Sequence, residues 1–183
     1  FFPNLVSTVA VGIIFKALMH PSKGLINKAL EAIGINGSDW LGNVKLALFS
    51  VAAVDVWKGL SIATVIFIAG IQSIDKTYYE AAMVDGANFW QRLRYVTLPM
   101  LSGAIMINLV FGITYGLKVF DIVYVLTNGG PGHATEVLTT YAFQLYSRGQ
   151  YGMSSALNTV LLVITAIIGV FIVKTLSKQE VQQ

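Results

Sequence analysis

The hydrophobic positions of this chain gather into four long stretches, separated by segments rich in polar residues and glycine. The stretches are residues 1–15, 44–74, 101–117 and 153–173. Because about 20 consecutive apolar residues cross a bilayer, each stretch is predicted to be a membrane-spanning helix. The first is shorter than this, so we expect it either to be cut short at its start or to be completed by Lys16 reaching the interface.

The intervening segments are residues 20–43, 75–99 and 128–152. Leu25–Ile33 alternates between apolar and polar faces and predicts a short surface helix. Four crossings place both chain ends on one side. The flanking cations number five against four: Lys76, Arg92, Arg94, Lys174 and Lys178 on one side, and Lys23, Lys28, Lys45 and Arg148 on the other. This narrow excess predicts that residues 75–99 are cytoplasmic and that 20–43 and 128–152 are extracytoplasmic loops.

Composition supports a membrane protein and excludes other classes. Only 11% of residues are charged and 55% are hydrophobic, whereas a soluble domain carries about 25% charged residues. The net charge of +3 comes from scattered Lys and Arg without a basic patch, so no nucleic-acid partner is expected. With no cysteine, two histidines and no paired catalytic carboxylates, we predict no metal site and no catalytic residue.

Residues 75–99 predict two short helices at an angle. Asp75 can cap the first helix, and Gly86 permits the backbone conformation in which helices commonly end. The second helix is predicted from about Ala87 to Pro99, whose missing amide marks the entry to the third span. Small alanines between two carboxylates would let this turn approach another surface closely.

A spaced motif makes this loop specific. Glu80-Ala81-Ala82 is followed by Asp85-Gly86-Ala87 and, eleven residues after Gly86, by Leu98-Pro99. The pattern resembles the cytoplasmic loop signature of binding-protein-dependent ABC transporter permeases. Further segments are similar to carbohydrate-uptake permeases of the maltose and glycerol-3-phosphate type: Gly24-Leu25-Ile26-Asn27, Trp40-Leu41, Trp57-Lys58-Gly59, residues 120–132 and Thr135-Glu136. Such permeases usually have six or more spans, so we expect this chain to be N-terminally incomplete.

The resemblance implies an all-α membrane protein, a polytopic helical bundle of the ABC importer permease type with about four transmembrane helices in residues 1–183. It implies uptake of a sugar or polyol phosphate across a bacterial or archaeal cytoplasmic membrane. The implied partners are a second permease, two ATPase subunits and an extracytoplasmic substrate-binding protein. The loop would be the coupling helix on an ATPase, through Glu80, Ala81, Ala82, Asp85, Gly86, Leu98 and Pro99. Because the chain has no phosphate-binding glycine loop, ATP and Mg are expected on the ATPase, and no cofactor on this chain.

Charges within the spans need partners or water. Asp55 and Lys58 are three residues apart, as are Lys118 and Asp121, so each pair can neutralise itself locally on one helix. Alternatively, they face a hydrated path. In the sugar permeases the corresponding helix faces line the substrate cavity, which implies these substrate-path candidates: Asp55, Lys58, Gly59, Ile62, Gly112, Tyr115, Gly116 and Val119. Tyr115 would supply a hydroxyl and a flat face for a sugar ring.

Two other functions stay open at this point. A secondary transporter driven by an ion gradient could use Asp55 or Asp121 as a proton or sodium site. A purely structural membrane anchor would leave the loop motif without an explanation.

Overall fold

The computed structural model describes residues 2–180, with side chains described as far as Lys174. This part of the chain is helical and contains no strand, which confirms the predicted all-α class. The elements in order are α1 (Phe2–Leu5), α2 (Thr8–Leu18), α3 (Leu25–Ala32), α4 (Val44–Gln72), α5 (Lys76–Val84), α6 (Phe89–Arg92), the π-helical turn η1 (Leu93–Thr97), α7 (Leu98–Met100), α8 (Ser102–Leu117), α9 (Asp121–Leu126), α10 (Leu138–Ser147) and α11 (Tyr151–Glu180).

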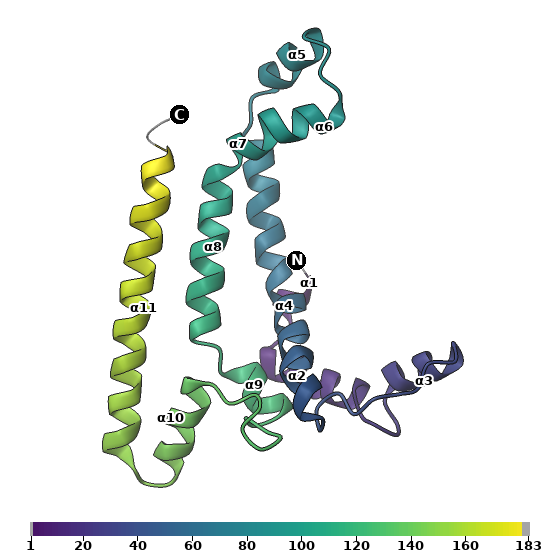
Figure 1. Ribbon diagram of the computed structural model, residues 1–183, viewed down its shortest axis with the longest axis vertical. Helices are drawn as coiled ribbons and strands as arrows, with labels where there is room; N and C mark the ends of the chain where they lie inside the picture. The colour runs from purple at the N-terminus through teal and green to yellow at the C-terminus, as the bar shows by residue number, and fades with distance from the viewer. Residues whose placement is uncertain (1, 181–183) are drawn as a thin grey trace.

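Two helices are long and apolar enough to cross a membrane. They are α4, with 29 residues, and the segment Tyr151–Lys174 of α11, with 24 residues. A third candidate span combines residues 89–100 with α8 across a bend of 64°. Figure 1 shows α4, α8 and α11 running side by side, with α8 in contact with both of the others. The second and fourth predicted spans are therefore present as long apolar helices, and the third is present as α8, with the bend lying between it and residues 89–100.

The first predicted span is not a single long helix. The chain breaks near Ser7 into α1 and the 11-residue α2, and 11 residues rise only about 16 Å, half the thickness of the hydrocarbon core. Instead, α2 packs closely on α9: a Cβ built on Gly12 would lie 2.6 Å from a methyl carbon of Val125. The described residues thus contain two or three candidate spans rather than four. Hydropathy correctly identified residues 1–15 as apolar. Packing of α2 on α9, rather than a full crossing of the membrane, buries part of this apolar surface.

The hydrophobic core lies at one end of the bundle, where α2, α4 and α9 meet. Its buried members are Val11, Met19, Val51, Val54, Ile122, Val123 and Leu126. Figure 1 shows the short helices α2, α3, α9 and α10 at this end and α5 and α6 at the opposite end. Residues 20–43 and 128–152 therefore lie opposite residues 75–99, as the single crossing that separates each of them from residues 75–99 requires. Which end faces the cytoplasm stays a prediction.

Buried Asn27 organises residues 20–43. Its side-chain amide donates to the carbonyls of Pro21 and Ser38, both at 2.8 Å. Its Oδ1 accepts from the Ser38 amide at 3.1 Å and from the Trp40 indole at 2.7 Å. The predicted surface helix is present as α3. Trp40, which donates to Asn27, is partly buried against the core.

Replacing Asn27 tests whether its hydrogen bonds stabilise residues 20–43. We expect Asn27→Ala to lower the free energy of local unfolding of residues 20–43 by about 1–3 kcal/mol, because it leaves two partly buried donors, the Ser38 amide and the Trp40 indole, without their acceptor. Hydrogen exchange at the Ser38 amide measures the change. Asn36→Ala, at an exposed asparagine nine residues along, is the matched control. Equal exchange in the two variants would contradict the assignment.

Candidate functional site

The hairpin of residues 75–99 stands beyond the ends of α4 and α8, and its first helix is capped at both ends (Figure 1). Asp75 accepts hydrogen bonds from the Thr77 amide at 2.9 Å and the Thr77 hydroxyl at 2.7 Å. These bonds hold the pKa of the exposed Asp75 carboxyl below its ordinary value of 3.8. The predicted cap at the start of α5 is confirmed.

The end of α5 is a Schellman turn. Gly86 has a φ of +75°, and its amide bonds to the Met83 carbonyl while the Ala87 amide bonds to the Ala82 carbonyl. The next helix begins with a capping box in which Asn88 and Gln91 each accept from the other's backbone amide, at 2.8 and 2.9 Å. The predicted stop at Gly86 is confirmed, whereas the Asn88 cap was missed although the spacing of Asn88 and Gln91 signals it.

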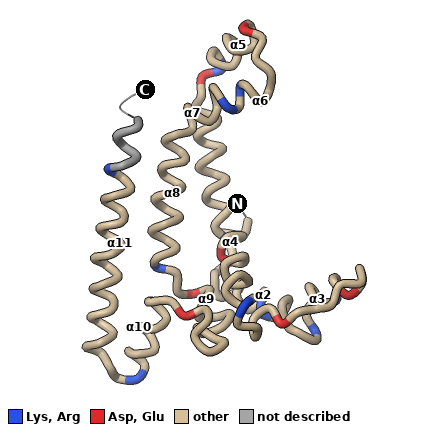
Figure 2. Tube along the Cα trace, viewed as in Figure 1, with Lys and Arg blue, Asp and Glu red and all other residues tan. Residues whose placement is uncertain are grey.

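Five of the seven predicted coupling residues lie on α5 and the turn that follows it. Glu80, Ala81, Asp85 and Gly86 are exposed and Ala82 is half-buried. Neither carboxylate has an ion-pair or hydrogen-bond partner among the described side chains. Figure 2 shows acidic residues along the first arm of the hairpin and basic residues on the neighbouring arm. Large apolar side chains are exposed around them: Met83, Val84, Phe89 and Trp90. Such a surface is typical of a docking site.

Leu98 and Pro99 lie apart from that tip, at the base of the hairpin. They belong to α7, between the π-helical turn and the bend at Leu101. The second predicted helix, about 87–99, is therefore divided into α6, η1 and α7. Because π-turns and prolines both disturb the regular helical ladder, this division places the change of direction where the hairpin joins α8.

The predicted substrate path lies between α4 and α8. The Tyr115 hydroxyl donates to Oδ1 of Asp55 at 3.4 Å, so residues 60 apart in sequence meet across the two helices. Lys58 forms no ion pair with Asp55 within the described structure. Three glycines, Gly59, Gly112 and Gly116, face open space, because an added Cβ would meet no atom within 4 Å. Ile62 is also exposed.

Two placements on this path are corrected. Because α8 ends at Leu117, Val119 does not continue the helix face of Tyr115, and it packs instead against the hydrophobic core. Lys118 and Asp121 lie on either side of the break between α8 and α9, so they are not neighbours on one helix. Periodicity cannot show where a helix ends when the next residues are apolar as well.

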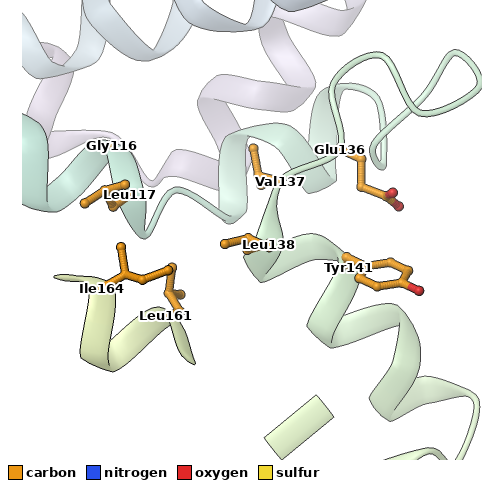
Figure 3. A pocket seen from close by; sticks show the side chains of 8 residues that line it. All are labelled: Gly116, Leu117, Glu136, Val137, Leu138, Tyr141, Leu161 and Ile164. Atoms are coloured by element: carbon orange, nitrogen blue, oxygen red, sulfur yellow. The ribbon is translucent and has the colours of Figure 1, made fainter. Parts of the chain in front are cut away.

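A pocket of about 430 Å³ lies where α8, α10 and α11 converge. Figure 3 shows its lining: Gly116, Leu117, Glu136, Val137, Leu138, Tyr141, Leu161 and Ile164. Only Gly116 was among the path candidates. The lining comes from segments far apart in sequence, and no local motif joins them.

Long apolar helices, one bent helix pair and an exposed, capped hairpin at one end define a helical membrane protein. The sequence matches the family of binding-protein-dependent transport system inner membrane components over residues 1–182. The chain belongs to this family, whose members are ABC transporter permeases. This membership favours the ATP-driven interpretation over an ion-gradient-driven secondary transporter.

Named relatives and solved structures are consistent with this family. The chain is 38% identical to the trehalose/maltose transport system permease protein MalF of Thermococcus litoralis, over 85% of this chain and 53% of that protein. It is 36% identical to the sulfoquinovosyl glycerol transport system permease protein SmoG of Agrobacterium fabrum, over 82% of this chain and 49% of that protein. A crystal structure of a bacterial ABC transporter that imports alginate matches with a TM-score of 0.88 and 26% identity, over 97% of this chain and 63% of that one. The chain thus spans about half the length of these curated relatives.

The Asp75 cap should make the start of α5 sensitive to acid. Because the pKa of this carboxyl is lowered in the folded protein, the stability that the cap contributes is fully present above its ordinary, unfolded pKa of 3.8. It is lost as the pH falls through the lower, folded pKa. We expect protection of the Thr77 amide against hydrogen exchange, corrected for intrinsic rates, to drop in this acid range. Asp75→Asn keeps a capping oxygen that does not titrate, so a drop of equal size in this variant would contradict the prediction.

Proposed function

We propose that this chain is part of a permease subunit of an ATP-driven ABC importer for a carbohydrate or related compound. The observation that carries the proposal is the exposed tip of α5, where the carboxylates of Glu80 and Asp85, which have no partner among the described side chains, lie among alanines and exposed apolar side chains. This surface has the small residues, charge and apolar area that docking into a groove of a second protein requires. The occupant would be an ATPase subunit, with a basic residue facing Glu80.

The wider assembly follows from this docking. ATP and Mg would be held by two ATPase subunits, whose closure would move α5 and, through α7, the bent third span. A second permease would complete the path across the bacterial or archaeal cytoplasmic membrane. An extracytoplasmic substrate-binding protein would meet the end formed by residues 20–43 and 128–152. One alginate transporter structure is described as a complex with a pentasaccharide-bound periplasmic protein, which supports such a partner here.

The substrate would pass the open face of α4 and α8. The glycines there leave room for a ligand, and the Tyr115 hydroxyl and the Asp55 carboxylate offer hydrogen bonds to sugar hydroxyls. The proteins similar to this chain are named for trehalose and maltose, for sulfoquinovosyl glycerol and for alginate. They support a carbohydrate as the substrate and do not select one carbohydrate among these.

Charge reversal at the tip tests the docking. In the full transporter we expect Glu80→Arg to reduce co-purification of the ATPase subunit about ten-fold or more, because the facing basic residue would be repelled. Glu31→Arg reverses an exposed carboxylate on α3, at the opposite end of the bundle, and should leave association unchanged. The proposal would be overturned if the Glu80→Arg variant bound the ATPase subunit normally and if vesicles containing that variant took up radiolabelled maltose and trehalose at the normal ATP-dependent rate.

Filling the open face tests the path. We expect Gly112→Leu to reduce ATP-dependent uptake about ten-fold or more while ATPase association stays normal, since a leucine side chain would occupy the space a ligand needs. Gly169→Leu makes the same change at a glycine of α11 that also has open space around it. Equal uptake by both variants would show that Gly112 does not face the path. Uptake is measured with radiolabelled maltose, trehalose and sulfoquinovosyl glycerol.

A further inference from the structure

Helix α5 has no hydrophobic core to hold it in place. None of the described residues of α5, α6 or η1 is buried. Most side chains of α5 are exposed, and Tyr79 and Ala82 are the two half-buried ones. Because apolar burial cannot fix the angle between α5 and the second arm of the hairpin, more specific contacts must do so.

One side-chain hydrogen bond joins the two arms within the described hairpin. The Tyr79 hydroxyl lies 3.1 Å from Oγ1 of Thr97, in a partly buried position. The Thr97 hydroxyl in turn donates to the carbonyl of Arg92 at 3.4 Å. Since a threonine hydroxyl has a single proton, which this second bond uses, the Tyr79 hydroxyl is the donor to Thr97. The result is a relay from Tyr79 through Thr97 to the backbone of the second arm.

The acceptor end of this relay lies at the base of α8. Thr97 is the last residue of the π-helical turn, in which the Leu98 amide bonds to the Leu93 carbonyl five residues earlier. Leu101 follows at the bend and is buried. It packs on α4, because a Cβ built on Gly70 would lie 2.9 Å from both Leu101 Cδ2 and Ala104 Cβ. Thr97 therefore belongs to a segment that continues into α8 and packs, through Leu101, on α4.

We propose that the Tyr79–Thr97 hydrogen bond is the strut that transmits displacement of α5 into α8. The inference rests on the proposed function, because it assumes that an ATPase moves α5. Without the bond, α5 keeps its backbone connections at residues 73–75 and 85–88 and its packing on η1, but the described residues show no other side-chain hydrogen bond from α5 to the second arm. Tyr79 and Thr97 are positioning residues: they contact neither nucleotide nor substrate, and they fix the angle at which α5 meets the base of α8.

Two nearly isosteric substitutions remove the bond and keep the packing: Tyr79→Phe and Thr97→Val. Because a hydrogen bond of this kind changes an equilibrium by about three- to ten-fold, we expect each variant to lower the ratio of docked to displaced α5 by that factor. The double variant should be no worse than either single one, since both remove the same interaction. Thr97→Ser retains the hydroxyl and should restore the ratio.

The measurement uses the cysteine-free sequence of the chain. Spin labels at Lys76→Cys on α5 and Leu109→Cys on α8, both exposed positions outside the proposed docking surface, report the distance between the two helices by pulsed electron resonance in the full transporter. Tyr78→Phe is the matched control, because Tyr78 is the exposed neighbour of Tyr79 and its hydroxyl makes no side-chain hydrogen bond within the described hairpin. A single narrow distance distribution is expected for the wild type and for this control.

The outcomes separate this inference from the function on which it rests. A displaced population in Tyr79→Phe and Thr97→Val, with normal ATPase co-purification, supports the strut. If these variants match Tyr78→Phe, the strut is wrong while the docking proposal stands. If Tyr79→Phe loses ATPase association and Thr97→Val does not, Tyr79 is a docking contact and the strut is again wrong. If the wild type itself binds no ATPase, the proposed function fails first.

Discussion

The close pairing of α4 with α8 is the contact on which the rest of the structure depends. At one end, Gly70 lets Leu101 and Ala104 approach the α4 backbone within van der Waals contact. Toward the other end, the Tyr115 hydroxyl reaches Asp55 across the same interface. The first contact determines where the hairpin leaves the bundle, and the second places a polar pair beside open glycine positions. One helix pair therefore positions both the docking surface and the predicted path.

The two ends of the molecule are stabilised in different ways. At the end that contains α2 and α9, apolar side chains from three helices form a buried core, and Asn27 satisfies the polar groups of the adjoining loop. At the hairpin end no described residue of α5 is buried, and hydrogen bonds at Asp75, Asn88 and Thr97 define the shape. An element held by directional bonds can keep its shape while its surface stays free for a partner.

The exposed apolar surface of the chain has a physical explanation in its family. Side chains such as Phe49, Phe111 and Phe171 are more than 60% exposed on the long helices, which would be unfavourable in water. In an inner membrane component, lipid replaces water on such faces. The bend of 64° before α8 shows that the helices are not all straight. The apolar helix α2 is too short to span a membrane, and it is buried by packing against α9 instead.

The sequence by itself determined the all-helical membrane class, the extent of α4 and α11, and the start and stop of α5, because each follows from local chemistry. Apolar length decides whether a helix can span, a carboxylate caps free amides, and a glycine accepts a positive φ. Tertiary structure alone decided that residues 1–15 do not form one span, that Val119 packs in the core, and that Asp55 meets Tyr115 rather than Lys58. It also decided the Tyr79–Thr97 contact and the pocket beside Gly116. These features join residues distant in the chain, and they depend on the angles at which helices pack, which hydrophobic periodicity does not encode.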